Sequence, residues 1–483
     1  MRTTTLRQLV RGDGTAVLTG ADVPVSGVAY RSDRVRPGDA FFCIPGFRHD
    51  GHDFAAEAVE RGAVALVCER ALELPVPQVV VADTRCALAA AAAIAYGDPT
   101  EQMSVVGVTG TNGKTTTTYL IDSILRTAGR TTGLIGTVET RIGTTRLASI
   151  RTTPESADLQ ELFARMLAEG VSAVSMEVSS HAIDLHRADA IHFAVAAFTN
   201  LTQDHLDYHH TLEEYWSVKR RLFTELDVAE RVVNIDDSRG QELARATGAR
   251  FTVGRDPEAA IRAADEAAGP TSTGFTLLVP DGSARITLPL AGAYNVSNAL
   301  VAAGCALALG ITLEHVVEGP ESAPQVPGRL ERIDEGQRFS VLVDYAHTPD
   351  SLSKAIAAVR AVTPGRVITV FGCGGDRDPE KRPLMGRAAG EGSDIVVVTS
   401  DNPRSEDPVG IILQIEDGLK PTGTRYDVEV DRRSGVTRAL SLATEGDAVL
   451  IAGKGHEDYQ IFADRTIHFD DREVAREELR ARC

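Results

Sequence analysis

Apolar runs and helical patterns alternate through the middle of the chain. Continuous apolar stretches at 171–178 and 193–198 predict buried strands, and just before them the apolar residues of 156–169 recur at helical spacing. Strands separated by helices are typical of a parallel sheet with helices on its faces. A later stretch, 275–288 (FTLLVPDGSARITL), predicts a hairpin with an Asp-Gly turn.

The two ends of the chain carry patterns of their own. The N-terminal part combines short β-like runs with a helical stretch at 54–61. Near the C-terminus the strand-helix alternation restarts, with strands expected at 340–343, 366–371, 394–399 and 448–452. We therefore predict an α/β protein of three domains: a smaller α/β domain at 1–99, a central P-loop-type domain with a mostly parallel sheet at 100–325, and a Rossmann-like α/β domain at 326–483.

Composition agrees with several compact domains and excludes some classes of function. The chain has 483 residues, whereas one ordinary domain holds roughly 100–200. A net charge of −18 opposes a nucleic-acid groove or an anionic membrane surface as the main partner. No apolar run reaches the roughly 18–20 residues that span a bilayer, and the N-terminus lacks an apolar signal region. Six scattered cysteines indicate neither disulfides nor zinc, so we expect a cytoplasmic protein.

The segment MSVVGVTGTNGKTTTTY predicts a strand, a glycine-rich turn and the start of a helix. Gly107, Gly110 and Gly113 would let backbone N–H groups approach a polyphosphate. Lys114 supplies a positive charge and Thr115 a hydroxyl for Mg²⁺. The strict pattern GxxxxGK[ST] is not met, because five residues separate Gly107 from Gly113. A tight structural turn is the simpler alternative, but Gly-Lys-Thr-Thr at a strand-to-helix junction favours an ATP or GTP site.

Two further polar clusters follow central strands and should lie at the same sheet edge as this loop. Glu177, in MEVSSHAI, and His205, in FTNLTQDHLDYHH, are candidate magnesium ligands, although a carboxylate suits this hard cation better than an imidazole does. The alternatives are a strand glutamate paired with a neighbouring helix and a capping or core histidine. Proximity to the phosphate loop favours the metal interpretation for both.

A lysine in the following helix has a plainer interpretation from the residues alone. Lys219 lies in EEYWSVKRRLF beside Arg220 and Arg221, which indicates a solvated helix face. The start of this helix has a capping-box pattern at Thr211 and Glu214.

Four polar clusters of the last domain begin where its predicted strands end: DYAHTP, GCGGDRD, SDNPR and GKGHEDYQ. Because ligands bind at the carboxyl ends of parallel strands, these clusters should converge. Asp344 and His347 could hold a nucleotide or order a reacting centre. Arg377 and Arg404 could bind carboxylates. Surface salt bridges are the alternative for the arginines. The residue types together predict a pocket for a zwitterion, formed by Arg377, Asn402, Arg404 and Glu457.

The order of these motifs resembles that of the Mur ligase family. From about residue 31 to residue 460 the chain reads, in order, TGTNGKTTT, RTTPES, MEVSSHAI, FTNLTQDHLDYH, NVSN, VPGRLERI, VDYAHTPDSL, GCGGDRDPEKRPLMG, DNPR and AGKGHEDYQ. In this family the longer glycine turn is the usual form of the phosphate loop. DNPR resembles the signature of members that add diaminopimelate rather than lysine.

The resemblance implies which residues bind ATP and magnesium. Lys114, Glu177, His205 and Lys219 would be catalytic, and magnesium would lie among Thr115, Glu177, His205 and Lys219. The family carries the matching lysine as a carbamate, so Lys219 is expected to be N6-carboxylysine. The implied ATP-binding residues are Gly110, Thr111, Asn112, Gly113, Lys114, Thr115, Thr116, Asn298, Arg329, Asp344 and His347.

The resemblance also implies where the other two substrates bind. The first domain would bind the UDP-sugar, and the last domain the amino acid. A UDP-muramoyl dipeptide would contact Ser32, Thr152, Thr153, Ser179 and Arg187. Diaminopimelate would contact Arg377, Asp401, Asn402, Pro403, Arg404, Gly453 and Glu457.

The activity implied by the resemblance is ATP-dependent addition of diaminopimelate to UDP-N-acetylmuramoyl-L-alanyl-D-glutamate through an acyl phosphate, in peptidoglycan precursor synthesis. The expected partners are these small molecules, with no nucleic acid and no membrane insertion, and the protein is expected to be a monomer. Three alternatives stay open: a lysine-adding ligase of the same family, a folylpolyglutamate-type synthetase, and an ATP-driven P-loop protein without ligation.

Overall fold

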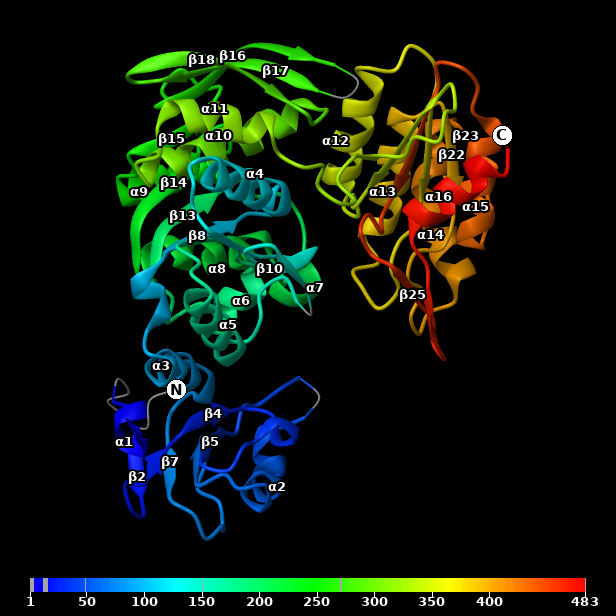
Figure 1. The fold of residues 1–483 in the computed structure, drawn as a ribbon. Helices are drawn as coiled ribbons and strands as arrows, with labels where there is room; N and C mark the ends of the chain where they lie inside the picture. The colour runs from blue at the N-terminus through cyan, green and yellow to red at the C-terminus, as the bar shows by residue number, and fades with distance from the viewer. Residues whose placement is uncertain (1–3, 12–15, 48, 150, 270–271, 483) are drawn as a thin grey trace.

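The computed structural model describes residues 4–11, 16–47, 49–149, 151–269 and 272–482. Figure 1 shows three lobes in chain order, each built around its own sheet, which confirms the predicted three-domain α/β class. The N-terminal lobe lies below the central lobe, and the C-terminal lobe lies beside the central one. None of the described helices is both long and apolar enough to cross a membrane.

The N-terminal lobe contains a small sheet whose strands are mostly parallel. Its order is β2 (Val17–Thr19), β7 (Gln78–Val80), β6 (Ala65–Cys68), β5 (Asp39–Phe42) and β4 (Gly27–Ala29), with β2 antiparallel to β7. Beside it, β1 (Thr4–Thr5) pairs with β3 (Pro24–Val25). Its helices are α1 (Leu6–Leu9), α2 (Ala55–Glu60) and α3 (Thr84–Tyr96). The predicted helix at 54–61 is confirmed as α2.

The central lobe contains a sheet with a parallel middle and antiparallel edges. Its order is β11 (Thr145–Ala148), β10 (Glu139–Ile142), β9 (Thr132–Ile135), β12 (Ala173–Glu177), β8 (Ser104–Thr109), β13 (Phe193–Phe198), β14 (Val228–Asn234), β15 (Phe251–Gly254), β16 (Ile261–Ala268), β17 (Thr273–Val279) and β18 (Gly282–Leu288). Strands β12, β8 and β13 are parallel neighbours, so the loops that follow them share one edge, as predicted. The predicted hairpin is confirmed as β17 and β18.

Helices cover both faces of the central sheet. They are α4 (Lys114–Thr127), α5 (Ser156–Ala168), α6 (Ser180–Asp184), α7 (Leu206–His209), α8 (Leu212–Thr224), α9 (Ser238–Thr247), α10 (Ala293–Ala308) and α11 (Leu313–Glu321). The capping box predicted for α8 is only half formed: the Thr211 side chain accepts a bond from the Glu214 N–H, but the reciprocal bond is not made.

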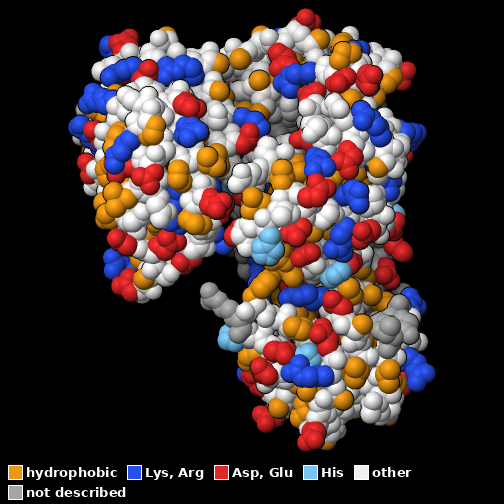
Figure 2. Space-filling view, turned by 180° about the vertical axis from the view of Figure 1, so that it is seen from behind, with side chains coloured by type: hydrophobic (Ala, Val, Ile, Leu, Met, Phe, Trp, Pro, Cys, Tyr) orange, Lys and Arg blue, Asp and Glu red, His pale blue; other side chains and the backbone are white. Residues whose placement is uncertain are grey.

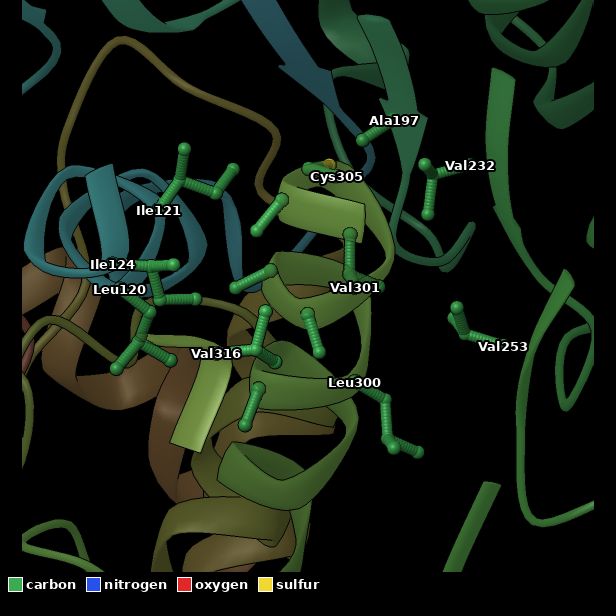
Figure 3. Packing of buried hydrophobic residues seen from close by; sticks show 14 of the residues in the cluster. Leu120, Ile121, Ile124, Ala197, Val232, Val253, Leu300, Val301, Cys305 and Val316 are labelled. Atoms are coloured by element: carbon green, nitrogen blue, oxygen red, sulfur yellow. The ribbon is translucent and has the colours of Figure 1, made fainter. Parts of the chain in front are cut away.

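Packing against α10 fixes the direction in which α4 leaves the phosphate loop. Figure 3 shows apolar side chains of α4 meeting α10, which in turn covers the central strands. The labelled residues are Leu120, Ile121, Ile124, Ala197, Val232, Val253, Leu300, Val301, Cys305 and Val316. Because this interface is fully buried, the start of α4 has a defined position relative to β8.

The C-terminal lobe is a sheet with helices packed on both faces. Its order is β19 (Glu331–Arg332), β20 (Ser340–Asp344), β24 (Ala448–Ala452), β21 (Val367–Phe371), β22 (Ile395–Val398) and β23 (Arg425–Val428), and all but β19 run parallel. One face packs on α12 (Pro349–Arg360), α13 (Lys381–Gly392) and α14 (Pro408–Leu419), and the other on α15 (Arg432–Leu442) and α16 (Asp471–Arg480). A hairpin of β25 (Tyr459–Ile461) and β26 (Thr466–His468) lies outside the sheet.

Candidate functional site

The glycines of the loop between β8 and α4 are required by its close contacts. Gly110 and Gly113 have φ of +148° and +88°. A Cβ at Gly113 would lie 2.2 Å from Asn298 Oδ1, and one at Gly110 would lie 1.9 Å from Thr199 Oγ1. Gly107 instead lies inside β8 under the Phe193 ring, so its predicted place in the phosphate loop is wrong. The loop is therefore built from the second and third glycines only.

Lys114 opens α4 and folds back over this loop. Its Nζ donates to the carbonyl oxygens of Gly110, at 3.0 Å, and Thr111, at 2.9 Å. Burial lowers the pKa of Lys114, while Glu177 and Asp204 oppose that shift. The ammonium thus lies at the loop, with two carboxylates close enough to influence its charge.

Glu177 ends β12 as a buried carboxylate beside the start of α4. Its Oε1 accepts hydrogen bonds from Thr115 Oγ1, at 3.0 Å, and from the Thr137 N–H, at 2.8 Å. Arg329, which follows the central domain in sequence, donates to the same Thr115 oxygen at 3.0 Å. A hydroxyl and a carboxylate oxygen therefore meet at the mouth of the phosphate loop, and hard cations prefer such ligands.

Lys219 is buried, so its interpretation as a solvated helix residue is wrong. Its Nζ donates to the Gly110 carbonyl at 3.0 Å and lies 4.5 Å from the centre of the Tyr215 ring. Burial lowers the pKa of this amine well below its usual value, and the nearby Lys114 charge lowers it further. No carboxylate forms an ion pair with Lys219 among the described residues, which favours the neutral amine.

His205 lies at the N-terminus of α7 with φ +56°, rather than in a packed core. Its Nε2 is 3.4 Å from Asp204 Oδ2, and its ring is 5.0 Å from that of His181. Partial burial lowers the pKa of His205, and His181 lowers it further although Asp204 opposes the shift, which leaves the imidazole neutral and able to act as a ligand.

These groups line a cavity of about 720 Å³, here called the central cleft. Residues 111–116 form one wall, and α10, the segment 344–347 and α12 form others. The Asp344 carboxylate accepts hydrogen bonds from the backbone N–H groups of Leu330 and Ala346, and burial raises the pKa of its carboxyl. The remaining lining residues that the sequence predicts for the site are Thr152, Glu177, Ser179, His205, Lys219, Asn298, Arg329, Asp344 and His347.

A second cavity of about 750 Å³, here called the C-terminal cleft, lies where the strands of the last domain end. Arg377 and Lys381 line it and form no hydrogen bond or ion pair with other described residues. The salt-bridge alternative is therefore wrong for Arg377. Lining residues from the predicted amino-acid pocket are Arg377, Asp401, Asn402, Arg404, Gly453 and Glu457, whereas Pro403 is buried behind them.

The GCGG and DNPR loops approach each other closely at this cleft. A Cβ at Gly375 would lie 1.9 Å from the Pro403 carbonyl, so only glycine permits the approach. Arg404 Nη1 donates to the Gly375 carbonyl at 2.7 Å, and φ of Arg404 is +53°. This contact orients the guanidinium and differs from the surface salt bridge considered for it.

A buried polar group supports the opposite wall of the C-terminal cleft. Glu457 Oε2 accepts bonds from Asn402, at 2.9 Å, and from the Lys454 ammonium, at 3.2 Å. Burial raises the pKa of Glu457 even though Lys454 opposes the shift. Gly453 leaves room for the Asp401 carboxylate, which would lie 2.6 Å from a Cβ there. The wall thus presents carboxylates opposite the unpaired cations.

The two clefts meet along a shared floor. Six residues line both: Thr137, Thr152, Asp204, His205, Tyr345 and His347. Tyr345 and His347 come from the C-terminal domain and the others from the central one, so the floor is completed by both. Asn112 of the phosphate loop also donates to Asp350 of α12 at 3.0 Å.

The residues expected to hold a UDP-muramoyl dipeptide are divided between two places. Thr152 and Ser179 line the central cleft, and Thr153 lies behind them, donating to the Glu177 carbonyl at 2.9 Å. Arg187 donates to the Thr153 carbonyl at 3.3 Å. Ser32 lies in the N-terminal domain, where it donates to Glu57, and lines neither cleft.

Four polar residues that line or support the clefts were missed in the sequence. Asp204 directly precedes His205, a predicted magnesium ligand, and Lys454 lies in the strand-end cluster GKGHEDYQ, so both could have been found. Lys381 follows GCGGDRD at the start of α13. Thr137 carries no such signal, because its role depends on the contact between Glu177 and the turn after β9.

A glycine loop at the edge of a parallel sheet and a cleft shared with a second α/β domain are typical of an enzyme that acts on a nucleotide. Family models match nearly the whole chain: "Mur ligase family, catalytic domain" over 24–107, "Mur ligase middle domain" over 108–306, and "Mur ligase, glutamate ligase domain" over 328–455. The chain belongs to the Mur ligase family.

Individual relatives cover almost the whole chain as well. The UDP-N-acetylmuramoyl-L-alanyl-D-glutamate–2,6-diaminopimelate ligase of Geobacillus thermodenitrificans is 47% identical over 482 residues, which is 98% of this chain and 99% of its own. The enzyme of the same name from Solibacter usitatus is also 47% identical, over 95% of this chain and 94% of its own. A solved structure with that name has 30% identity and a TM-score of 0.70, and covers 100% of this chain and 99% of its own.

Proposed function

We propose that this protein joins diaminopimelate to UDP-N-acetylmuramoyl-L-alanyl-D-glutamate at the expense of ATP. One observation carries the proposal: the central and C-terminal clefts meet along a floor that both domains contribute. ATP in the central cleft and an amine in the C-terminal cleft would therefore reach the same carboxylate. The names of the relatives support the choice of substrates.

The phosphate loop would hold ATP through its backbone N–H groups. Asn112 to Thr116 line the central cleft, and Gly113 lets the loop pass against Asn298. Lys114 would turn from the loop carbonyls to the β- and γ-phosphates, where its charge stabilises the transition state of phosphoryl transfer. Arg329, which donates a hydrogen bond to Thr115, is in position to contact the same phosphates.

The residues present fit a magnesium ion. Thr115 and Glu177 offer hard oxygen ligands 3.0 Å apart, and His205 offers a neutral imidazole from the shared floor. Lys219 is buried with a lowered pKa, so its neutral amine could take up CO₂ and become a carbamate anion. Bound Mg²⁺ would neutralise charge on the phosphates during transfer.

The chemistry would proceed in two substitutions without a protein nucleophile. A carboxylate oxygen of the terminal D-glutamate attacks the γ-phosphorus, the bond to the β-phosphate oxygen breaks, and ADP leaves. The amine nitrogen of diaminopimelate then attacks the acyl-phosphate carbonyl, and inorganic phosphate leaves as the amide forms. The protein's part is to position three substrates and stabilise charge.

The C-terminal cleft suits an amino acid with charges at both ends. Arg404 is oriented by Gly375, and Arg377 and Lys381 are unpaired, so these cations can bind a carboxylate. Glu457 keeps Oε1 without a hydrogen bond among the described residues and can accept an ammonium. Diaminopimelate carries a second carboxylate and ammonium at its distal end, whereas lysine carries only an ammonium there.

The UDP-muramoyl substrate would span the N-terminal domain and the central cleft. Thr152 and Ser179 line the cleft, Thr153 and Arg187 support them, and Ser32 lies in the N-terminal domain. The proposed substrates are all small soluble molecules, and we propose that the protein acts in the cytoplasm as a monomer.

Amine selectivity tests this proposal directly. Phosphate release should be measured with ATP, Mg²⁺ and the UDP-muramoyl dipeptide, adding either diaminopimelate or lysine. We expect release and a tripeptide product with diaminopimelate, and little of either with lysine. Preference for lysine would identify the lysine-adding activity, and turnover independent of both amines would contradict ligation.

A further inference from the structure

Three metal-binding side chains from two domains meet outside both clefts. Asp83 caps α3, Cys86 lies in the first turn of α3, and His186 lies in the loop after α6. One ligand atom of each lies within 4.8 Å of the others. Among the described residues, no other group of three histidine, cysteine or acidic side chains meets this spacing. No local pattern indicates this group, because Cys86 and His186 lie 100 positions apart in the sequence.

His186 is already oriented as a metal ligand. Its Nδ1 lies 2.6 Å from Asp189 Oδ2, and a carboxylate at that distance accepts the Nδ1 proton. The Nε2 lone pair is then available for a metal, and histidine ligands are usually held in this way. The backbone of His186 has φ +56°, and bonds to the carbonyls of Ile183 and Ala182 maintain this turn.

Asp83 and Cys86 are held together by the helix cap. Asp83 Oδ1 accepts the backbone N–H groups of Arg85, at 2.7 Å, and Cys86, at 3.0 Å. This leaves Asp83 Oδ2 available for a ligand. Cys86 is exposed on the first turn of α3. A helix N-terminus favours the thiolate form of a cysteine, which is the form that binds metals.

From these contacts we infer that Asp83, Cys86 and His186 form a Zn²⁺ site that joins the N-terminal and central domains. A thiolate, an imidazole and a carboxylate oxygen together suit zinc and are unsuitable for magnesium. Zinc bonds of about 2.0–2.3 Å place ligand atoms roughly 3.5 Å apart, so the side chains need to close by about 1 Å. Three protein ligands leave a fourth position for water.

Bound zinc would connect two elements that already touch through charged residues. Arg85, also in the first turn of α3, pairs with Glu155 at 3.1 Å, and Glu155 pairs with Arg187 at 3.3 Å. Arg187 directly follows His186. The metal would therefore restrain α3 against the loop that carries Arg187, and so fix the N-terminal domain relative to the central one.

Cobalt binding tests the site with a spectrum rather than an activity. Co²⁺ replaces zinc in such sites and gives an absorption band when a thiolate binds it, whereas the hard ligands of the central cleft give none. The full-length protein is titrated with Co²⁺ in excess Mg²⁺, and Zn²⁺ is then added. We expect a thiolate band that saturates at one equivalent and disappears when Zn²⁺ displaces the cobalt.

Variants assign the band to its ligands. Cys86→Ser should abolish it, and His186→Gln should weaken Co²⁺ binding at least tenfold. His192→Gln removes another histidine paired with an aspartate, Asp227 at 2.8 Å, and should change nothing. Each variant's melting temperature without metal establishes folding, and either of the first two suffices if the other fails to fold. Absence of the band in the unaltered protein, or its persistence in Cys86→Ser, would overturn the inference.

Discussion

The central and C-terminal clefts are similar in size but differ in how their charges are held. In the central cleft, hydrogen bonds of 3.0 Å hold the charged groups in place. Lys114 and Lys219 both donate to the Gly110 carbonyl, and Glu177 accepts a bond from Thr115. In the C-terminal cleft, Arg377 and Lys381 have no partner among the described residues. Figure 2 shows from behind how the C-terminal lobe extends away from the N-terminal lobe, leaving a recess between them.

This difference indicates a division of labour. A phosphoryl-transfer site gains from groups fixed before the reaction, because fixed charges need no rearrangement in the transition state. An amino-acid site can use unpaired cations, because the substrate's own carboxylates complete the pairs. Closure between the domains would then bring the amine to the shared floor.

Removing the phosphate-loop charge should have the largest effect. Lys114→Ala should lower kcat at least about 100-fold, the scale seen when one group that stabilises transition-state charge is lost. Phosphate release and tripeptide formation should fall together. Unchanged melting temperature would show that the fold survives, and near-normal amide formation would remove Lys114 from the proposed mechanism.

The buried amine of the central cleft should be the next most sensitive group. Lys219→Ala should lower activity roughly 100-fold, because the carbamate anion proposed to lie near the phosphates is lost. Added small carboxylate anions should restore part of it. Only the neutral amine takes up CO₂. Because its lowered pKa keeps the amine of Lys219 neutral at a lower pH than an ordinary lysine, the carbamate should be lost only as the pH falls below the pKa of Lys219. A mass 44 units above that of the unmodified protein would report the carbamate; no anion rescue would contradict this role.

A change in the C-terminal cleft should affect one substrate selectively. Arg404→Ala should raise the KM for diaminopimelate roughly 10- to 100-fold, as expected for loss of a hydrogen bond to a charged group. The KM for ATP should stay within about twofold of normal. Arg338→Ala, which removes an exposed arginine paired with Glu445 at 3.3 Å, is the matched control. Equal changes for both substrates would mean that the two clefts do not work separately.

The smallest effect is expected for substitution of Gly129, and comparison with Gly113 distinguishes backbone strain from a steric clash. Gly129 and Gly113 both have positive φ, but nothing lies within 4 Å of a Cβ at Gly129. Gly129→Ala should therefore cost about 1–2 kcal/mol of stability and leave kinetics unchanged. Gly113→Ala meets Asn298 as well and should also weaken ATP binding. Similar ATP affinities in the two variants would contradict the tight loop geometry.

Local signals allowed much of the fold and site to be predicted. The phosphate loop and the strand-end clusters are short segments whose residues act near where they stand in sequence, and parallel strands bring their ends together. Strand β23 was missed because its residues, RYDV, are partly exposed at a sheet edge and lack an apolar run. Lys219 was misjudged from its neighbours Arg220 and Arg221, because its burial depends on the distant Gly110.

The coupling of ATP cleavage to amide formation tests the central claim that the two clefts make one active site. Phosphate and tripeptide should be quantified together while the UDP-muramoyl dipeptide and diaminopimelate are omitted in turn. The account predicts one phosphate for each tripeptide formed and almost no phosphate release when the dipeptide is absent. Phosphate release that continues at the same rate without the dipeptide and without the amine would contradict it.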